Sequence, residues 1–207
     1  MIKFEMTNTY GWEAAIRGMR NPFNSWDKSD SKFEYAYGAM HTFTIGEKDL
    51  ELMLKLRKGG SDDRKYARQI FVSVDITAPL YWWKEYDTYK VGTVANSTST
   101  MHTLHKRDLT LADFSTDHMS PYALSVLEEY IHDINVFRRQ YVETGDKQHW
   151  YDIIQLLPSS FNQKRTCTLN YENLINMYHA RKFHKLDEWH ILCDWVEQLP
   201  YSVIITG

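Results

Sequence analysis

The spacing of apolar residues predicts that helices make up most of the chain. Apolar side chains recur three or four positions apart through residues 121–144, with Pro121 at the start and Gly145 after the end. Proline in the first turn and glycine just past the last one commonly limit a helix, so we expect the longest helix here. Apolar spacing and end signals predict further helices over residues 10–20, 46–58, 61–68, 80–89, 147–156, 170–184 and 187–198.

Alternating or continuous apolar runs predict the strands. The strongest is QIFVSVDIT, over residues 69–77. Further strands are expected over residues 2–7, 41–45, 165–169 and 201–206. Residues 32–39 suit either a short helix or an irregular segment. An α/β chain follows from this mixture of elements.

Composition limits the class of protein. The chain has 207 residues, 43% hydrophobic and 25% charged, which fits one folded domain over residues 1–207. A net charge of −3 argues against general nucleic-acid binding, which needs a basic excess. No apolar run reaches the roughly 18 residues of a membrane-spanning helix, and the first residues lack a signal peptide's apolar segment. We therefore expect a cytoplasmic protein without membrane contact.

Motifs for metals and phosphate loops are weak. Glu129 and His132 have the spacing of a di-iron carboxylate pair, but the second such pair is missing. There is no Gly-x-Gly-x-x-Gly motif. Cys193 lies near His190 but falls on an apolar helical stripe, so we interpret it as a core residue. We therefore predict no metal site.

The segment over residues 78–102, APLYWWKEYDTYKVGTVANSTSTMH, is dense in groups that bind or react. It follows the strongest strand, and loops after buried strands commonly carry sites in α/β proteins. On the predicted helix, Lys84, Asp87 and Thr88 share one face, and Glu85 and Tyr89 share another. The alternative is a buried helix followed by a plain surface loop, because Ser and Thr runs are usually loops.

Three segments together resemble the flavin-dependent thymidylate synthases. They are GWEAAIRGMRNPFNS at residues 11–25, ITAPLYWWKEYDTYKVGTVANSTSTMH at 76–102, and LPSSFNQKRTCTLNYENLINMYHARKFHKLDEWHI at 157–191. The resemblance covers most of the chain in order. It implies an α/β (α+β) chain with the ThyX-like fold, a central mixed β-sheet flanked by long helices. It also implies a homo-oligomer, a tetramer in that family.

The resemblance also implies a cofactor and a substrate. Thr88, Tyr89 and Lys90 stand where the family has the Arg-His-Arg triplet that holds the flavin, and Asn170 and Asn176 match asparagines that contact it. FAD is the implied cofactor. Arg181 matches the arginine that holds the pyrimidine ring and is the implied catalytic residue. The implied substrate-binding residues are Lys84, Glu85, Asp87, Asn96, Ser97, Ser99 and Arg181.

Several family arginines are replaced in this chain. Two of the charges of the triplet are lost, and Met101 and Ile154 stand at two other arginine positions. Each such arginine makes strong, charge-assisted contacts with anions. The resemblance therefore implies a divergent flavoenzyme acting on a pyrimidine nucleotide, with altered substrate or cofactor use. A non-catalytic nucleotide-binding protein and a structural oligomer with a vestigial site are the alternatives.

Overall fold

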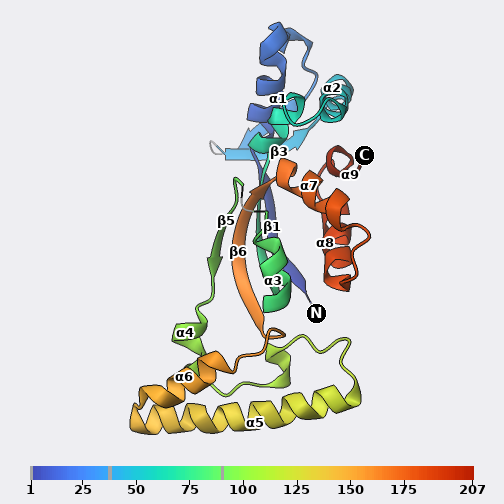
Figure 1. Cartoon of the computed structure of the whole chain (residues 1–207). Coiled ribbons are helices and arrows are strands. Elements are labelled where there is room, and N and C mark those ends of the chain that lie inside the picture. The colour runs from blue at the N-terminus through green and yellow to red at the C-terminus, as the bar shows by residue number, and fades with distance from the viewer. Residues whose placement is uncertain (1, 37–38, 90) are drawn as a thin grey trace. The chain divides into compact units, whose positions relative to one another are not determined.

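A four-stranded sheet and a separate two-stranded hairpin form the β-structure of the chain. The computed structural model describes residues 2–36, 39–89 and 91–207. The sheet has the strand order β1-β4-β6-β5, and β2 pairs with β3 (Figure 1). The strands are β1 (Lys3–Tyr10), β2 (Lys32–Ala36), β3 (Ala39–Thr44), β4 (Phe71–Pro79), β5 (Val94–Ser97) and β6 (Asn162–Asn170).

Helices account for most of the remaining structure, which confirms the predicted α/β class. The α-helices are α1 (Trp12–Arg20), α2 (Glu47–Lys58), α3 (Leu80–Tyr86), α4 (Thr100–Thr103), α5 (Pro121–Thr144), α6 (Lys147–Gln155), α7 (Tyr171–Arg181), α8 (Asp187–Glu197) and α9 (Val203–Thr206). Short 3-10 segments are η1 (Asn21–Phe23), η2 (Trp26–Lys28), η3 (Asp63–Gln69), η4 (Leu104–Lys106) and η5 (Leu111–Asp113). Among the described residues, no helix is long and apolar enough to cross a membrane.

The chain divides into two compact units, and β4 and β6 pass from one to the other. The first unit consists of Met1–Glu5, Asp75–Thr88 and Ala95–Thr166. The second consists of Met6–Val74, Tyr89–Val94 and Cys167–Gly207. That residues 1–207 form a single domain stays a prediction.

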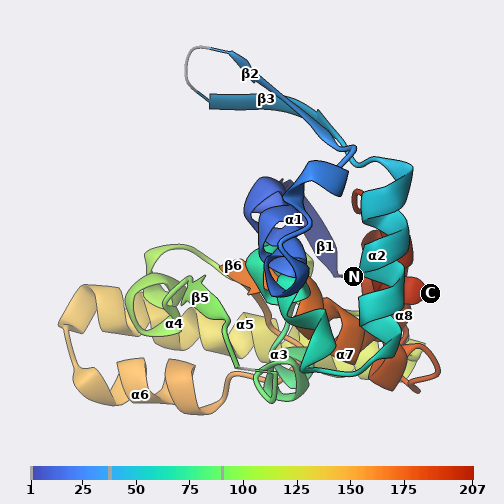
Figure 2. The ribbon, with the colours of Figure 1, turned by 90° about the horizontal axis from the view of Figure 1, so that it is seen from above.

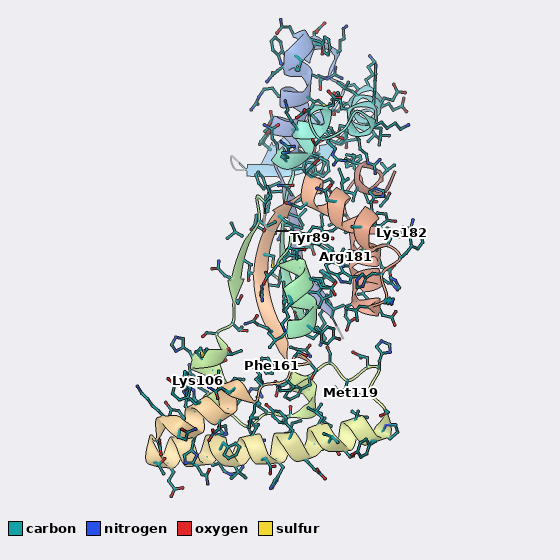
Figure 3. All side chains as sticks on the ribbon, in the orientation of Figure 1. Tyr89, Lys106, Met119, Phe161, Arg181 and Lys182 are labelled. Atoms are coloured by element: carbon teal, nitrogen blue, oxygen red, sulfur yellow. The ribbon has the colours of Figure 1, made fainter. Side chains whose placement is uncertain are left out.

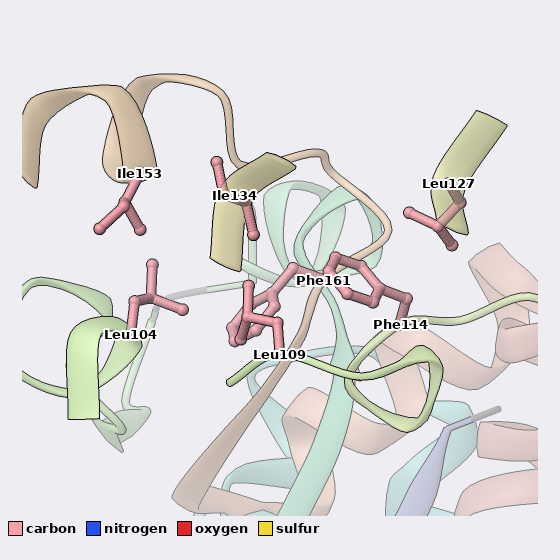
Figure 4. Close-up of a cluster of buried hydrophobic side chains, with 7 residues drawn as sticks. All are labelled: Leu104, Leu109, Phe114, Leu127, Ile134, Ile153 and Phe161. Carbon is pink, nitrogen blue, oxygen red and sulfur yellow. The ribbon is translucent and has the colours of Figure 1, made fainter. Parts of the chain in front are cut away.

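The core of the first unit lies between α5, α6 and the segment before α5 (Figure 4). Buried side chains there come from Leu104, Leu109, Phe114, Leu127, Ile134, Ile153 and Phe161. Burial of one such side chain contributes about 1.5–3 kcal/mol, so this cluster holds the two helices together. Pro121 at the start of α5 and Gly145 in a left-handed conformation (φ 69°) at its end confirm the predicted limits of this helix.

Helix α3 is fixed in the first unit by aromatic packing and by bonds to the β6 segment. The ring of Trp82 stacks on that of Tyr86 with the ring centres 5.1 Å apart, and it meets the ring of Trp83 edge-on at 5.0 Å. The indole Nε1 of Trp83 donates to the Gln163 carbonyl over 3.0 Å. Pro79, the residue before the helix, is extended at ψ 152°. The helix ends at Tyr86, so Asp87, Thr88 and Tyr89 do not share helix faces with Lys84 and Glu85 as predicted.

In the second unit, a buried carboxylate joins α2 to the segment before β2. Asp49 is fully buried and accepts from Arg20 Nε at 2.6 Å and from the hydroxyl groups of Ser29 and Ser31 at 2.7 and 2.6 Å. Burial by itself would raise the pKa of Asp49, but these donors outweigh it and hold the pKa below its usual value. The cluster fixes the base of the β2–β3 hairpin, which extends beyond α1 and α2 (Figure 2).

Two sequence expectations were wrong at the level of local structure, and one strand was not predicted. Residues 32–39 were expected to be helical or irregular, but β2 pairs with β3 in the antiparallel register Phe33–Phe43. Residues 201–206 were expected to be a strand, but α9 forms and buries Ile204 and Ile205 completely. A short apolar run does not by itself distinguish a strand from a buried helix. No strand was predicted over Val94–Ser97, where the structure has β5.

Candidate functional site

Arg181, at the end of α7, is held by two aromatic side chains of the second unit. Its Nε donates to the hydroxyl of Tyr89 over 2.9 Å, and Figure 3 shows the two residues beside each other. The guanidinium carbon lies 4.6 Å from the ring centre of Trp189 and 5.5 Å from that of Tyr89. Trp189 is fully buried in α8. A guanidinium that packs on aromatic rings is held in a defined orientation.

A second group of polar residues lines a cavity of about 610 Å³ in the same unit. The cavity is bounded by Arg68, Phe71, Val91, Gly92, Asn170, Glu172, Asn173 and Asn176. Its size is within the roughly 300–1,000 Å³ typical of small-molecule sites. Asn170 and Asn176, both predicted from sequence to bind the cofactor, are therefore brought together. Asn173 also lines this cavity and was not predicted from the sequence as a site residue.

The start of α7 fixes the two buried asparagines. Asn170 is the N-cap: its side-chain oxygen accepts from the Asn173 backbone N–H over 3.0 Å. In return, the Asn173 side-chain oxygen accepts from the Asn170 backbone N–H over 3.1 Å, and its Nδ2 donates to the Val91 carbonyl over 2.7 Å. This reciprocal capping box satisfies N–H groups that the first turn of a helix leaves unpaired. It also ties the segment at Val91 to α7.

Asn176 is oriented by Arg64, which also forms an ion pair with Glu172. Arg64 Nη2 donates to the Asn176 side-chain oxygen over 3.2 Å. Arg64 Nε lies 3.0 and 2.8 Å from the two carboxylate oxygens of Glu172, which is largely buried. The charge of Glu172 at the cavity wall is therefore balanced by Arg64. Arg68, also on η3, is exposed and donates through Nη2 to the Ser61 carbonyl over 3.1 Å.

The predicted substrate-binding residues in the first unit have different surroundings. Asp87 forms an ion pair with Arg165, 3.0 Å from its Nη1, and the Arg165 guanidinium lies 4.1 Å from the ring centre of Trp83. Lys84 and Thr88 are exposed, and the Thr88 hydroxyl donates to the Glu85 carbonyl over 2.7 Å. Arg165, which was not predicted as a site residue, thus balances the charge of Asp87 within the first unit.

The remaining predicted residues fall on or after β5. Asn96 and Ser97 are exposed on that strand, and Ser99 is half-buried just before α4. The Ser99 carbonyl accepts from the hydroxyl of Thr103 over 2.7 Å. Lys90, predicted to bind the cofactor, lies outside the described residues. Among the described residues, no group of three or more His, Cys, Asp or Glu side chains is placed to hold a metal ion.

Comparison with solved structures identifies the fold. A flavin-dependent thymidylate synthase ThyX from Helicobacter pylori, complexed with FAD and dUMP, superposes with a TM-score of 0.73 at 15% identity, covering 100% of this chain and 97% of that one. Another structure of the Helicobacter pylori enzyme with FAD and dUMP gives 0.69 at 16% identity, covering 99% and 97%. The chain thus has the fold of the flavin-dependent thymidylate synthases, as the resemblance implied.

A related structure has a different stated reaction. The UMP/dUMP methylase PolB from Streptomyces cacaoi, bound with 5-Br dUMP, matches with a TM-score of 0.65 at 13% identity, over 98% of this chain and 93% of that one. No protein-family model and no curated protein sequence matches the chain.

Proposed function

We propose that this chain is a divergent flavin-dependent thymidylate synthase-like protein, a flavoenzyme that acts on a pyrimidine nucleotide. The observation that carries the proposal is Arg181, a guanidinium held in one direction by Tyr89 and Trp189 on this fold. A cation so placed suits a pyrimidine carbonyl, which is a hydrogen-bond acceptor. The structures that share the fold are named as complexes with FAD and with pyrimidine nucleotides, which supports this substrate class.

The cavity of the second unit suits a flavin nucleotide. Amide groups of Asn170 and Asn176 face a volume of about 610 Å³, beside the half-exposed ring of Phe71. Amides and one guanidinium can bind the carbonyl and phosphate oxygens of such a cofactor. A bound flavin would supply hydride chemistry, while the protein supplies orientation and charge. The side chains of Asn170 and Asn176 would hold it, together with Thr88, Tyr89 and Lys90.

Arg181 would bind the pyrimidine ring, and the substrate would also contact Lys84, Glu85, Asp87, Asn96, Ser97 and Ser99. Thr88 offers a hydroxyl group at a position where the resembled family has an arginine. The proposed cofactor site therefore has fewer strong contacts for an anion. For this reason the proposed substrate or cofactor use is altered from ordinary thymidylate synthesis.

The visible absorption spectrum of the purified protein tests the enzyme proposal. Near-stoichiometric flavin absorbance, or uptake of added FAD, is expected. A colourless protein that also takes up no added flavin contradicts it. Arg181→Ala should then abolish turnover of a pyrimidine nucleotide and leave the flavin spectrum in place, because the two ligands are proposed to contact different residues.

A non-catalytic nucleotide-binding oligomer is the second candidate. It is favoured by the loss of arginines, which weakens cofactor binding more than it weakens the fold. Such a protein would be stabilised by nucleotides without taking up flavin, because ligand binding raises stability by mass action. A thermal-shift screen of the wild type with pyrimidine nucleotides and, separately, with FAD distinguishes the two candidates: stabilisation by a nucleotide without stabilisation by FAD favours the non-catalytic protein.

A further inference from the structure

The hydrogen bonds around the asparagine cavity determine which ends of its amides face the ligand. The Asn170 side-chain oxygen accepts from the Asn173 N–H, and the Asn176 side-chain oxygen accepts from Arg64. Both partners can only donate, so each amide must present its oxygen to them. These partners therefore do not use the NH₂ groups of the two asparagines, and both residues line the cavity, Asn176 with an exposed side chain. The Asn170 Nδ2 lies on the side of Gly92, 3.2 Å from where a Cβ of that residue would be.

The charged residues at the cavity add to this donor character. Arg68 lines the cavity and has five N–H donors in its guanidinium, of which the Ser61 carbonyl takes one bond. Glu172 also lines it, but Arg64 balances that carboxylate at 2.8–3.0 Å. The three charges sum to about +1, because two arginines face one glutamate. The cavity thus combines two amide donors, one guanidinium and a positive balance.

We propose that this cavity binds a phosphate group of the ligand, with Asn170, Asn176 and Arg68 as its three donors. The inference rests on the proposed function, because it specifies which part of a nucleotide enters the cavity. A phosphate group offers only acceptor oxygens and carries a negative charge at pH 7, which matches a site of donors. An imide edge, as in uracil or the flavin ring, places an N–H between two carbonyl groups and suits this site less well.

In this proposal Arg68 supplies a guanidinium in place of the replaced family arginines. The chain lacks several arginines that the resemblance implied near the flavin and the nucleotide. Arg68 comes instead from η3, twenty positions before Thr88 in the sequence. A guanidinium can bind two phosphate oxygens at once, which a lysine cannot. The phosphate could belong to a pyrimidine nucleotide or to a flavin nucleotide.

Isosteric variants test the donors without disturbing the fold. Asn176→Asp keeps an oxygen for Arg64, and Asn170→Asp keeps a good N-cap for α7. Each variant replaces an NH₂ donor in the cavity by a carboxylate oxygen. We expect the melting temperature without ligand to stay the same or rise. The dissociation constant for a phosphorylated ligand should increase about tenfold or more, as expected for losing a hydrogen bond to a charged group.

Matched ligands and a matched control complete the experiment. Titration calorimetry and thermal shift would compare UMP with uridine, FMN with riboflavin, and inorganic pyrophosphate alone. Arg68→Gln should weaken binding of the phosphorylated ligands, and Arg68→Lys should weaken it less. Lys65→Gln removes a positive charge from the same 3-10 segment, outside the cavity lining, and should have little effect.

The outcomes separate this inference from the proposed function. If uridine and riboflavin bind as tightly as their phosphates, or if the Asn→Asp variants bind phosphates normally, the inference is wrong while nucleotide binding stands. If pyrophosphate binds through these residues but no nucleotide or flavin binds, the inference stands and the proposed function fails. If the wild type binds none of these ligands, both are wrong. If the variants lose affinity for UMP alone, the phosphate is that of a pyrimidine nucleotide. If they lose affinity for FMN alone, it is that of a flavin nucleotide.

Discussion

The Nε of Arg181 donates to the hydroxyl of Tyr89 over 2.9 Å, although 92 positions separate the two residues in the sequence. The guanidinium also packs on Trp189. Tyr89 stands where the resembled family has the histidine of its flavin-binding triplet. In this chain the tyrosine hydroxyl orients Arg181, so the proposed cofactor contact of Tyr89 and the proposed substrate contact of Arg181 are linked.

Removing that hydroxyl should weaken nucleotide binding while the fold persists. Tyr89→Phe keeps the ring packing and deletes the bond to Arg181. A hydrogen bond to a charged group is worth about 1.5–3 kcal/mol, so the dissociation constant for a pyrimidine nucleotide should rise roughly tenfold or more. Titration calorimetry measures this change. The control is Tyr10→Phe, which alters an exposed tyrosine of the same unit. Unchanged binding by Tyr89→Phe would show that the hydroxyl does not orient Arg181 for the ligand.

The buried carboxylate of Asp49 should be a main determinant of stability in the second unit. Asp49→Asn keeps the shape but removes the charge that pairs with Arg20 at 2.6 Å. Breaking a buried pair leaves the other charge uncompensated, so the free energy of unfolding should fall by about 3 kcal/mol. Urea denaturation measures it. Asp62→Asn, on an exposed residue, is the control and should change stability by less than about 0.5 kcal/mol.

The same carboxylate predicts an acid-sensitive stability. Its pKa is lower in the folded state than in the unfolded chain, because Arg20 and the two serine hydroxyls outweigh the effect of burial. A depressed pKa stabilises the fold above the unfolded value of about 4. This contribution is lost as the pH falls below about 4 toward the folded-state pKa. Thermal melts between pH 3 and 6 should show a steeper loss for the wild type than for Asp49→Asn.

Gly92 should be needed for both the backbone and the cavity. Its φ is +74°, and an added Cβ would lie 3.2 Å from the Asn170 Nδ2. Gly145 has a similar φ of +69° with nothing within 4 Å of an added Cβ. Gly145→Ala therefore isolates the backbone cost, about 1–2 kcal/mol. Gly92→Ala should cost at least as much stability and also weaken ligand binding. Equal effects of the two variants on binding would argue against a ligand at Asn170.

The oligomeric state remains a prediction from the resemblance. Tyr122 and Val142 on α5 are 79% and 62% exposed, and such apolar groups are compatible with a subunit interface. Light scattering after size-exclusion chromatography should give about four times the 24.6 kDa chain mass if the protein is a homotetramer. A mass of one chain would contradict it.

Much of the fold could be predicted because the signals are local. Pro121 and Gly145 limited the longest helix correctly, and the apolar run of residues 69–77 corresponds to β4. The short elements could not be predicted in the same way. The segment before β3 becomes a strand because Phe33 pairs with Phe43, and α9 is a helix that buries Ile204 completely. In both cases packing against another segment, and not the local apolar pattern, selects the structure.

In the candidate site, too, the sequence indicated some residues and only tertiary contacts revealed others. The sequence by itself pointed to Asn170, Asn176 and Arg181, because their residue types and order resemble a known pattern. Only the tertiary structure showed that Arg64 bonds to Asn176, that Arg68 lines the same cavity, and that Tyr89 and Trp189 hold Arg181. The direction of an amide or a guanidinium depends on its hydrogen-bonding partners in space. These partners come from distant segments, so spacing along the chain does not reveal them.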